Sequence, residues 1–335
     1  MEAKWTAIAG IVAFVIGIII APMMISYLRK LKFGQQIITE YGPTWHKKKQ
    51  GIPTMGGIIF IFSIYAAYFA VAFPYYASSD YLIGRILPSV GLTSLIIATL
   101  LGFMGFIDDF VKIKQKHNQG LTEKQKLIIQ IFIGTIFIIY NGIRTNFRTS
   151  VDIPFTDITI EFSYFFYLFA LIAFVGFVNA VNLTDGIDGL ATSVTLPVAA
   201  FFTVTAIAKN AFDLSILAAA LLGGCIAFLV YNKNPAKVFM GDTGSMFLGG
   251  TVVTLAFGLD MPLMLVIVGF VYMIEAFSVM IQVAYFKATK GKRLFKMTPI
   301  HHHFELSGWS ENKICVVFGF VSFVFCLLAS LWVLL

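Results

Sequence analysis

Long runs of apolar residues, separated by short polar segments, dominate the sequence. A helix needs about 20 apolar residues to cross about 30 Å of hydrocarbon, and ten stretches approach that length. The predicted spans are residues 7–28, 56–74, 86–107, 127–143, 163–181, 187–208, 213–231, 239–258, 262–286 and 314–335. The pattern therefore predicts an all-α polytopic membrane protein with ten transmembrane helices. The even number places both termini on one side of the membrane.

Composition supports this fold class, because 59% of the 335 residues are apolar and only 12% are charged. A soluble domain carries about 25% charged residues. The low charge extends along the whole chain without a Pro/Gly/Ser linker, so we expect a single membrane domain, residues 1–335. Cys225, Cys315 and Cys326 lie in apolar runs without CxxC spacing. They are read as packing residues rather than as metal ligands or a disulfide.

The net charge of +7 would raise the question of nucleic acid in a soluble protein, but here the basic residues lie between the spans. If the connections alternate between two sides, 19 of the 24 lysines and arginines share one side. The other five are Lys4, Arg85, Arg144, Arg148 and Lys209. The positive-inside rule assigns the basic side to the cytoplasm and both termini to the outside, without a nucleic-acid partner.

The outer segment 144–162 has apolar residues in near alternation around Asp152, Pro154 and Asp157. This pattern is typical of strands, so we predict a short β-hairpin on the outer surface. The chain has no internal repeat, and the inverted-repeat signature of many secondary transporters is therefore missing.

The uncommon polar motifs all fall on or beside the predicted cytoplasmic face. They are PTMGG at 53–57, FIDDF at 106–110, NAVNLTDGIDGL at 179–190, NKNPAKVFMGDTGS at 232–245 and PIHHHFE at 299–305. Motifs from distant parts of the chain thus converge on one surface, which predicts the functional site there.

Asp108 and Asp109 are adjacent near the end of a span. Neighbouring helical side chains point about 100° apart, so two different roles are favoured over one shared role. The alternative is a pair of interfacial acids balanced by Lys112. Clustering with other acids on the same face favours the functional interpretation.

Polar residues recur every three positions in the next motif, at Asn179, Asn182, Asp185 and Asp188. Neighbours in such a series share a helical face, so Asp185 and Asp188 can serve one ligand. The glycines of the DGIDG segment predict a break between two spans, where backbone can approach a ligand. The alternative is a capped reverse turn.

Asp242 lies in GDTGS at a predicted helix start. The free N–H groups of a helix start suit an anion or a metal-phosphate complex. The alternative is an ordinary N-cap, because Asp, Thr and Ser are common in that role.

His301, His302 and His303 lie in a long predicted loop, 287–313. Consecutive histidines do not suit a zinc site, whereas imidazoles that bind phosphate or move protons fit. The alternative is a solvated polar run.

Lys49, Lys112, Lys124 and Lys126 border the motifs. Each alone reads as a positive-inside anchor, but together they can neutralise a polyphosphate. The acids, without thiolates, favour Mg²⁺ over zinc. Carboxylates for a divalent cation and lysines for phosphate oxygens, at a membrane surface, indicate phosphoryl transfer.

In their order, these five motifs resemble the phospho-N-acetylmuramoyl-pentapeptide-transferase family, from about residue 25 to the end of the chain. The resemblance implies transfer of phospho-N-acetylmuramoyl-pentapeptide from its UDP derivative to undecaprenyl phosphate, with Mg²⁺. The products would be UMP and lipid I, a peptidoglycan precursor. The resemblance also implies the bacterial inner membrane, with the active site on the cytoplasmic face.

By position, the resemblance makes Asp242 the principal magnesium ligand and, with Asp108 and Asp109, a catalytic residue. Asn182, Asp185 and Asp188 would hold the nucleotide, with Asp188 near uracil. The histidines would face the sugar-peptide or diphosphate end. These histidines are His301, His302 and His303. The other implied substrate-binding residues are Lys49, Thr54, Lys112, Lys126, Asn179, Asn232 and Ser245.

Three alternatives stay open at this point. The same acids would serve a related transferase that uses UDP-N-acetylglucosamine. A membrane carrier or cation channel would place ionisable groups near the bilayer centre, where only Glu275 is a candidate, itself read first as a hydrogen-bonded structural acid. Catalysis can proceed by direct attack or through a phosphoryl-enzyme, and the apolar surface permits a homodimer.

Overall fold

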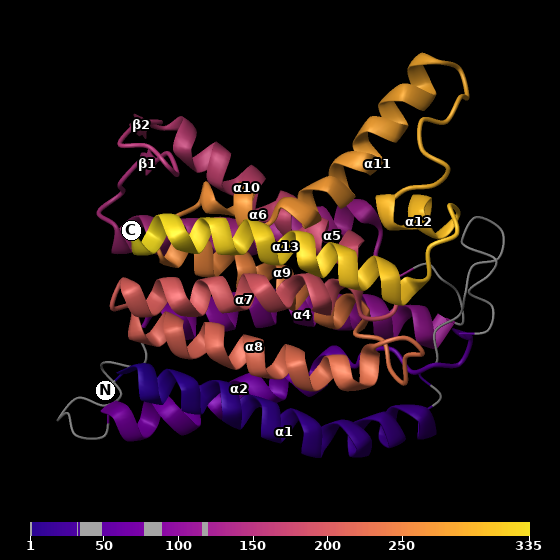
Figure 1. Ribbon diagram of the computed structural model, residues 1–335, viewed down its shortest axis with the longest axis horizontal. Coiled ribbons are helices and arrows are strands. Elements are labelled where there is room, and N and C mark those ends of the chain that lie inside the picture. The colour runs from indigo at the N-terminus through magenta and orange to yellow at the C-terminus, as the bar shows by residue number, and fades with distance from the viewer. Residues whose placement is uncertain (1, 32, 34–48, 77–88, 116–119) are drawn as a thin grey trace.

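The computed structural model describes residues 2–31, 33, 49–76, 89–115 and 120–335. The chain is a bundle of long helices, with both termini at the same end (Figure 1). Nine helices of the described chain are long and apolar enough to span a membrane, which confirms a multi-span helical architecture. These helices are α1 (Glu2–Lys30), α2 (Gly57–Tyr76), α4 (Val90–Gln115), α5 (Glu123–Arg144), α6 (Phe165–Thr184), α7 (Leu190–Ala208), α8 (Phe212–Asn232), α11 (Phe270–Ala288) and α13 (Glu311–Leu334).

The predicted span 239–258 corresponds to α9 (Gly241–Gly258), which is not among these nine candidate spans. Every residue of α9 from Thr243 to Gly258 is buried. Its hydroxyls are satisfied inside the helix, since Thr251 Oγ1 donates to Phe247 O at 2.8 Å and Thr254 Oγ1 to Gly250 O at 2.8 Å. Because other helices surround α9, its sequence tolerates glycine and threonine where a lipid-facing helix would carry larger apolar residues.

Glycines let α9 approach its neighbours closely. A Cβ on Gly249 would lie 2.8 Å from Val178 Cα of α6, and one on Gly250 would lie 3.0 Å from Ala98 Cα of α4. Small residues at helix contacts allow this backbone approach in membrane bundles. The contacts fix α9 between α4 and α6, which carry residues of the site described below.

The predicted span 262–286 starts too early, because the chain forms two helices there and only α11 is a candidate membrane span. The short α10 (Met264–Val268) ends before Gly269, and α11 begins at Phe270 and runs away from the bundle at an angle (Figure 1). A Cβ on Gly269 would lie 2.5 Å from Phe177 Cε1 of α6. The break therefore lies at a tight tertiary contact that the local apolar pattern does not contain.

The predicted hairpin is confirmed as a two-stranded antiparallel sheet. Strand β1 (Ser150–Asp152) pairs with β2 (Thr159–Glu161), and Val151 lies opposite Ile160. The hairpin lies at the end of the bundle that carries both termini (Figure 1).

The predicted break in the DGIDG segment is also confirmed, since α6 ends at Thr184 and α7 begins at Leu190. Gly189 has φ +80°, a left-handed conformation that favours glycine. The predicted long loop is not irregular throughout, because it contains α12 (Ile300–Glu305). The three cysteines are buried free thiols, as a packing role predicts.

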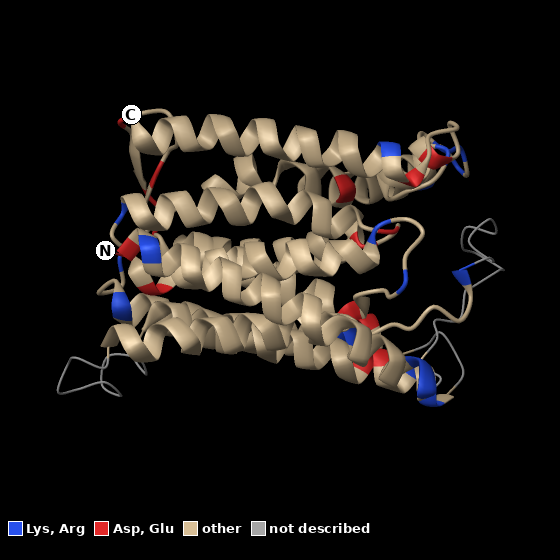
Figure 2. Cartoon of the chain, turned by 60° about the horizontal axis from the view of Figure 1, so that its bottom comes forward, with Lys and Arg blue, Asp and Glu red and all other residues tan. Residues whose placement is uncertain are grey.

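Charged residues gather mostly at the two ends of the bundle, and its long middle carries few (Figure 2). This distribution agrees with a body that spans an apolar layer. Some residues of the charge count lie outside the described residues, as does the start of the predicted span at 86–88. Those charged residues are Lys32, Lys47, Lys48, Arg85 and Lys116.

Candidate active site

Three carboxylates from two helices converge at one end of the bundle. Asp108 and Asp109 lie on α4, and Asp242 lies in the first turn of α9. One oxygen from each carboxylate lies within 4.8 Å of the others, so the three form a group that could hold a metal ion. Asp108 and Asp109 are buried, and Asp242 is half-buried. Such close negative charges require compensation by cations.

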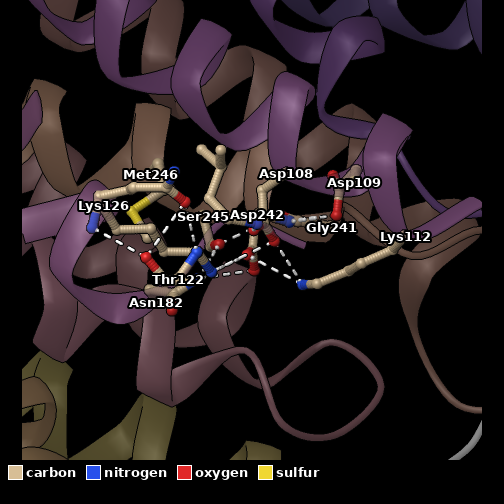
Figure 3. A network of polar contacts seen from close by, with 12 residues as sticks. Asp108, Asp109, Lys112, Thr122, Lys126, Asn182, Gly241, Asp242, Ser245 and Met246 are labelled. Atoms are coloured by element: carbon tan, nitrogen blue, oxygen red, sulfur yellow. Dashed lines mark hydrogen bonds and ion pairs between the residues drawn. The ribbon is translucent and has the colours of Figure 1, made fainter. Parts of the chain in front are cut away.

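Two lysines provide that compensation (Figure 3). Lys112 Nζ lies 2.5 Å from Asp108 Oδ2 and 3.2 Å from Asp242 Oδ2. Lys126 Nζ lies 2.9 Å from Asp242 Oδ2 and 3.2 Å from Asp108 Oδ2. Lys112 is one turn beyond Asp108 on α4, whereas Lys126 comes from the start of α5. Each amine contacts both carboxylates, so the four groups form a closed ring of alternating charge.

Asp109 has different partners from its neighbour Asp108. Its Oδ1 accepts from the Asp242 backbone N–H at 3.2 Å. Its Oδ2 accepts from Thr243 N at 3.0 Å and Thr243 Oγ1 at 2.7 Å. A carboxylate that accepts from the first N–H groups of a helix satisfies donors without intrahelical partners. Asp109 therefore caps α9, and the two adjacent acids diverge as helical geometry predicts.

Two glycines make the approach of α4 to α9 possible at the site. A Cβ on Gly105 would lie only 2.1 Å from Asp242 O. Gly241 has φ +68°, and a Cβ there would lie 2.4 Å from Asp109 Oδ2 and 2.6 Å from Thr54 Oγ1. A larger residue at either position would push the acids apart. The same contact places the buried Thr54 of the PTMGG motif beside Asp109.

Amide side chains from α6 and α5 complete the site on another side. Asn182 Nδ2 donates to Asp242 Oδ1 at 3.0 Å and to Ser245 Oγ at 2.8 Å. One turn earlier, Asn179 Nδ2 donates to Gln130 Oε1 at 2.7 Å, and Gln130 Nε2 donates back to Asn179 Oδ1 at 3.2 Å. Asn182 thus contacts an acid directly, whereas Asn179 contacts the amide group of Gln130.

A second polar cluster surrounds Asp188. Lys49 Nζ lies 2.6 Å from Asp188 Oδ1 and 2.6 Å from Glu311 Oε2 of α13. Asp188 Oδ2 accepts from Asn234 Nδ2 at 3.0 Å and from Ala236 N at 2.9 Å. The Asp188 backbone N–H donates to Glu311 Oε2 at 3.0 Å. Asp188 thereby joins the 185–189 loop to the segment after α8 and to the start of α13.

Asp185 is half-buried in the same loop, between the two clusters in sequence. Burial, with the negative charges of Asp242, Asp109 and Asp188, raises the pKa of Asp185 well above its ordinary value. The loop therefore places a carboxyl group in the field of the other acids, where it binds a proton more readily than usual.

The histidines lie on α12 and point to different partners. His301 and His302 are buried, which contradicts a solvated polar run for these two. His301 Nδ1 lies 3.0 Å from Glu275 Oε2, and His302 Nδ1 lies 2.6 Å from Glu305 Oε2. The half-buried His303 accepts from the Lys296 backbone N–H through Nδ1 at 3.2 Å.

The structure does not bring Asn232 into the acid cluster. This buried residue ends α8, and its Nδ2 donates to Val238 O at 2.9 Å, within the segment that leads to α9. Gln130 and Glu311 contact predicted site residues but were not themselves predicted. Gln130 has a sequence signal, as an amide inside an apolar span. Glu311 has none, because an acid in the first turn of a helix is common.

Two family models match parts of the chain. Residues 92–260, which include all three acids, match the family model "Glycosyl transferase family 4". Residues 49–61, which include Lys49 and Thr54, match "Phospho-N-acetylmuramoyl-pentapeptide-transferase signature 1".

Similar proteins cover nearly the whole chain. The phospho-N-acetylmuramoyl-pentapeptide-transferase of Halalkalibacterium halodurans is 44% identical, over 95% of this chain and 94% of its own. That of Clostridium perfringens strain 13 is 46% identical, over 96% of both chains. That of Listeria welshimeri is 43% identical, over 93% of both chains. Identity at this level over almost the full length establishes the family. The chain therefore belongs to the phospho-N-acetylmuramoyl-pentapeptide-transferase family.

Proposed function

We propose that this protein transfers phospho-N-acetylmuramoyl-pentapeptide from UDP-N-acetylmuramoyl-pentapeptide to undecaprenyl phosphate. The products are UMP and lipid I, for peptidoglycan synthesis. The observation that carries the proposal is the ring of Asp108, Asp242, Lys112 and Lys126 in a chain of this family. Lysines that already donate to carboxylate oxygens are placed to donate to phosphate oxygens when a substrate binds, and phosphoryl transfer depends mainly on such positioning.

Mg²⁺ is the cofactor that fits the donor set. The three clustered acids offer carboxylate oxygens and no sulfur or imidazole, the chemistry that suits a hard cation. Asp242 is the principal ligand in this proposal, because it is the least buried of the three acids and contacts both lysines. The ion, when bound, would neutralise charge on the diphosphate. Treatment with EDTA is expected to abolish UMP release, and added Mg²⁺ to restore it.

The reaction is a direct displacement at phosphorus. An oxygen of the lipid phosphate forms a bond to the phosphorus that carries the sugar, and the bond from that phosphorus to the UMP phosphate oxygen breaks. A phosphate near pH 7 is largely deprotonated, so it needs little help from a base. Asp108 accepts any remaining proton from the lipid phosphate. Lys112 and Lys126 stabilise charge on the reacting phosphates, whereas Asp109 keeps the start of α9 in place.

The phosphoryl-enzyme alternative is tested with the UDP-sugar alone. Direct displacement predicts no labelled protein and no UMP without the lipid acceptor. Stoichiometric UMP release in the absence of lipid would support an aspartyl-phosphate instead.

The remaining motif residues bind the rest of the substrate in this proposal. Asn182, Asp185 and Asp188 hold the nucleotide, and Asp188 with Lys49 lies near uracil. The three histidines serve the sugar-peptide or diphosphate end. The cleft residues that complete this set are Thr54, Asn179, Asn232 and Ser245.

The proposed topology has ten spans, which are the nine candidate helices and α9. Both termini lie outside the inner membrane. The acid cluster then faces the cytoplasm, where UDP-sugars are found. The common end of the two termini and the bias of basic residues support it. Alkaline phosphatase fused to the C-terminus is expected to be active, and a cytoplasmic reporter fused there to be silent. A homodimer is a further proposal, tested by the mass of the purified protein in detergent.

One assay distinguishes the candidate functions. Purified protein receives Mg²⁺, undecaprenyl phosphate and either UDP-N-acetylmuramoyl-pentapeptide or UDP-N-acetylglucosamine, and UMP is measured. We expect UMP only with the first donor. Release with the second donor alone would identify the related transferase, and no release with either donor would leave a carrier or channel. The family match favours the transferase.

A further inference from the structure

Glu275 and His301 form a fully buried pair behind the 185–189 loop. Glu275 lies on α11, and His301 lies on α12. Glu275 Oε2 is 3.0 Å from His301 Nδ1 and 3.4 Å from the His301 backbone nitrogen. The backbone N–H can only donate, so an acceptor oxygen must occupy this position. Two donors of one residue thus converge on a single carboxylate oxygen.

This geometry determines which ring nitrogen carries the hydrogen. A carboxylate accepts hydrogen bonds, so Nδ1 is the donor. His301 Nε2 is buried and has no hydrogen-bond partner in the described chain. A hydrogen on Nε2 would therefore be a buried donor without an acceptor, which is destabilising. The arrangement favours the neutral ring with hydrogen on Nδ1 and a lone pair on Nε2.

The Nε2 side of the ring faces the loop. A Cβ on Gly186 would lie only 2.1 Å from His301 Nε2, so the ring packs directly against the backbone of this glycine. Gly186 lies between Asp185 and Asp188 in sequence. The position of the His301 ring therefore limits where the backbone that carries both acids can lie.

We propose that Glu275 is a positioning residue that acts through His301. By holding the ring in the Nδ1–H form against Gly186, Glu275 sets the position of the loop that presents Asp185 and Asp188. The inference rests on the proposed function, because that function assigns the nucleotide to this loop.

Stability alone does not explain the choice of glutamate at this position. Glu275 Oε1 is buried without a hydrogen-bond partner in the described part of the chain. An apolar side chain of similar size would avoid the penalty of burying that oxygen. A buried, half-satisfied acid is expected where it has a task that an apolar residue cannot perform.

Two substitutions separate hydrogen bonding from packing. Glu275→Gln keeps an oxygen acceptor at the same place, whereas Glu275→Met keeps the approximate size and removes the acceptor. Loss of an outer hydrogen-bond partner of a functional histidine weakens binding about 10- to 100-fold at metal sites. We expect Glu275→Met to raise the KM for the UDP-substrate by about 10-fold, with kcat less affected, and Glu275→Gln to stay close to wild type.

Gln282→Met is the matched control. Gln282 lies two turns along the same helix, and its Oε1 accepts from the backbone N–H groups of Leu294 and Phe295. Its loss is expected to lower the melting temperature in detergent without changing the KM. A Glu275→Met protein that folds and keeps the wild-type KM would overturn the proposal.

The tautomer is measured independently of activity by ¹⁵N NMR of histidine-labelled protein. The chain has five histidines, so the His301 signals are assigned by comparison with His301→Gln. We expect a protonated Nδ1 and an unprotonated Nε2 in the wild type and in Glu275→Gln. A protonated Nε2 in the wild type would overturn the proposal, even if Glu275→Met does not fold. A wild-type protein without UMP release would instead contradict the proposed function and leave the tautomer measurement valid.

Discussion

Lys126 of α5 contacts Asp242 of α9, with Nζ 2.9 Å from Oδ2, although the two residues are 116 positions apart in the chain. Lys126 also lies 3.2 Å from Asp108 Oδ2, so it bridges acids from two helices. An amine in this position balances the acids in the absence of substrate. It is also close enough to the acids to contact the phosphate oxygens of a diphosphate that binds there.

Replacement of Asp242 by asparagine should remove activity. The Asp242→Asn protein loses a charge that contacts both lysines, and removal of one such electrostatic group lowers kcat by about 10²–10³-fold. Asp108→Asn should have an effect of the same order. UMP release with saturating substrates and Mg²⁺ provides the measurement.

The control for this experiment is Asp260→Asn. Asp260 pairs with Arg144 Nη2 at 2.5 Å and lines a pocket with Asp152 of the hairpin, away from the acid cluster. Turnover of this variant should match the wild type. Wild-type turnover in Asp242→Asn would exclude that residue from the mechanism.

Asp109 should affect stability more than its neighbour does. Asp109 accepts three hydrogen bonds from the first residues of α9. Loss of a helix cap lowers the free energy of unfolding by about 0.5–2 kcal/mol. Asp109→Ala should therefore melt at a lower temperature in detergent than Asp108→Asn, which retains the α9 cap. Equal melting temperatures would contradict the capping role.

Gly105→Ala should disrupt the contact between α4 and α9. The added methyl group would lie 2.1 Å from Asp242 O, so the helices must separate. Overpacking of this kind typically lowers stability by about 1–3 kcal/mol, and we also expect loss of UMP release because the acids move apart.

Gly176→Ala of α6 is the matched substitution, since a Cβ there would have no atom of the described residues within 4 Å. Alanine is also the better helix former. This variant should keep activity and melt at or above the wild-type temperature. A Gly105→Ala protein with unchanged melting temperature and activity would argue against the tight contact.

The pH dependence of stability should report on Asp185. Its raised pKa means that the folded chain binds a proton more tightly than the unfolded chain does. Stability from this group is therefore fully present below the ordinary carboxyl pKa of about 3.9 and is lost as the pH rises toward the folded pKa. Asp185→Asn, which stays neutral, should melt at a higher temperature than the wild type near pH 7. The difference should disappear below about pH 4. If the melting temperatures of the wild type and of Asp185→Asn change equally with pH, this assignment is refuted.

Much of the fold could be predicted from the sequence, because lipid contact imposes a local apolar pattern. The hairpin and the break after Thr184 were predictable from alternation and glycine content. The division of α10 from α11 was not, because Gly269 at the break packs against Phe177 of α6, a tertiary contact that the local sequence does not contain. The polar character of α9 is explained only by the helices that enclose it.

The candidate site likewise has a part that the sequence predicts and a part that only the structure shows. The acids were recognisable as clustered charges in an apolar chain, and the geometry brings Asp108, Asp109 and Asp242 together. The pairing of Lys49 with Glu311 joins residues 262 positions apart, and no local pattern contains it. The Glu275–His301 contact likewise needed the tertiary arrangement of α11 and α12.

The enclosure of α9 has a consequence for biosynthesis. A segment rich in glycine and threonine partitions into lipid less favourably than its neighbours do. Apart from α10, the helices that contact α9 most extensively, among them α2, α4, α6, α7 and α8, precede it in the chain. They are therefore translated first. When α9 leaves the ribosome, the helices that will surround it can already lie in the bilayer. Insertion of the segment that carries Asp242 is then a packing step against these helices rather than a transfer of an isolated helix into hydrocarbon.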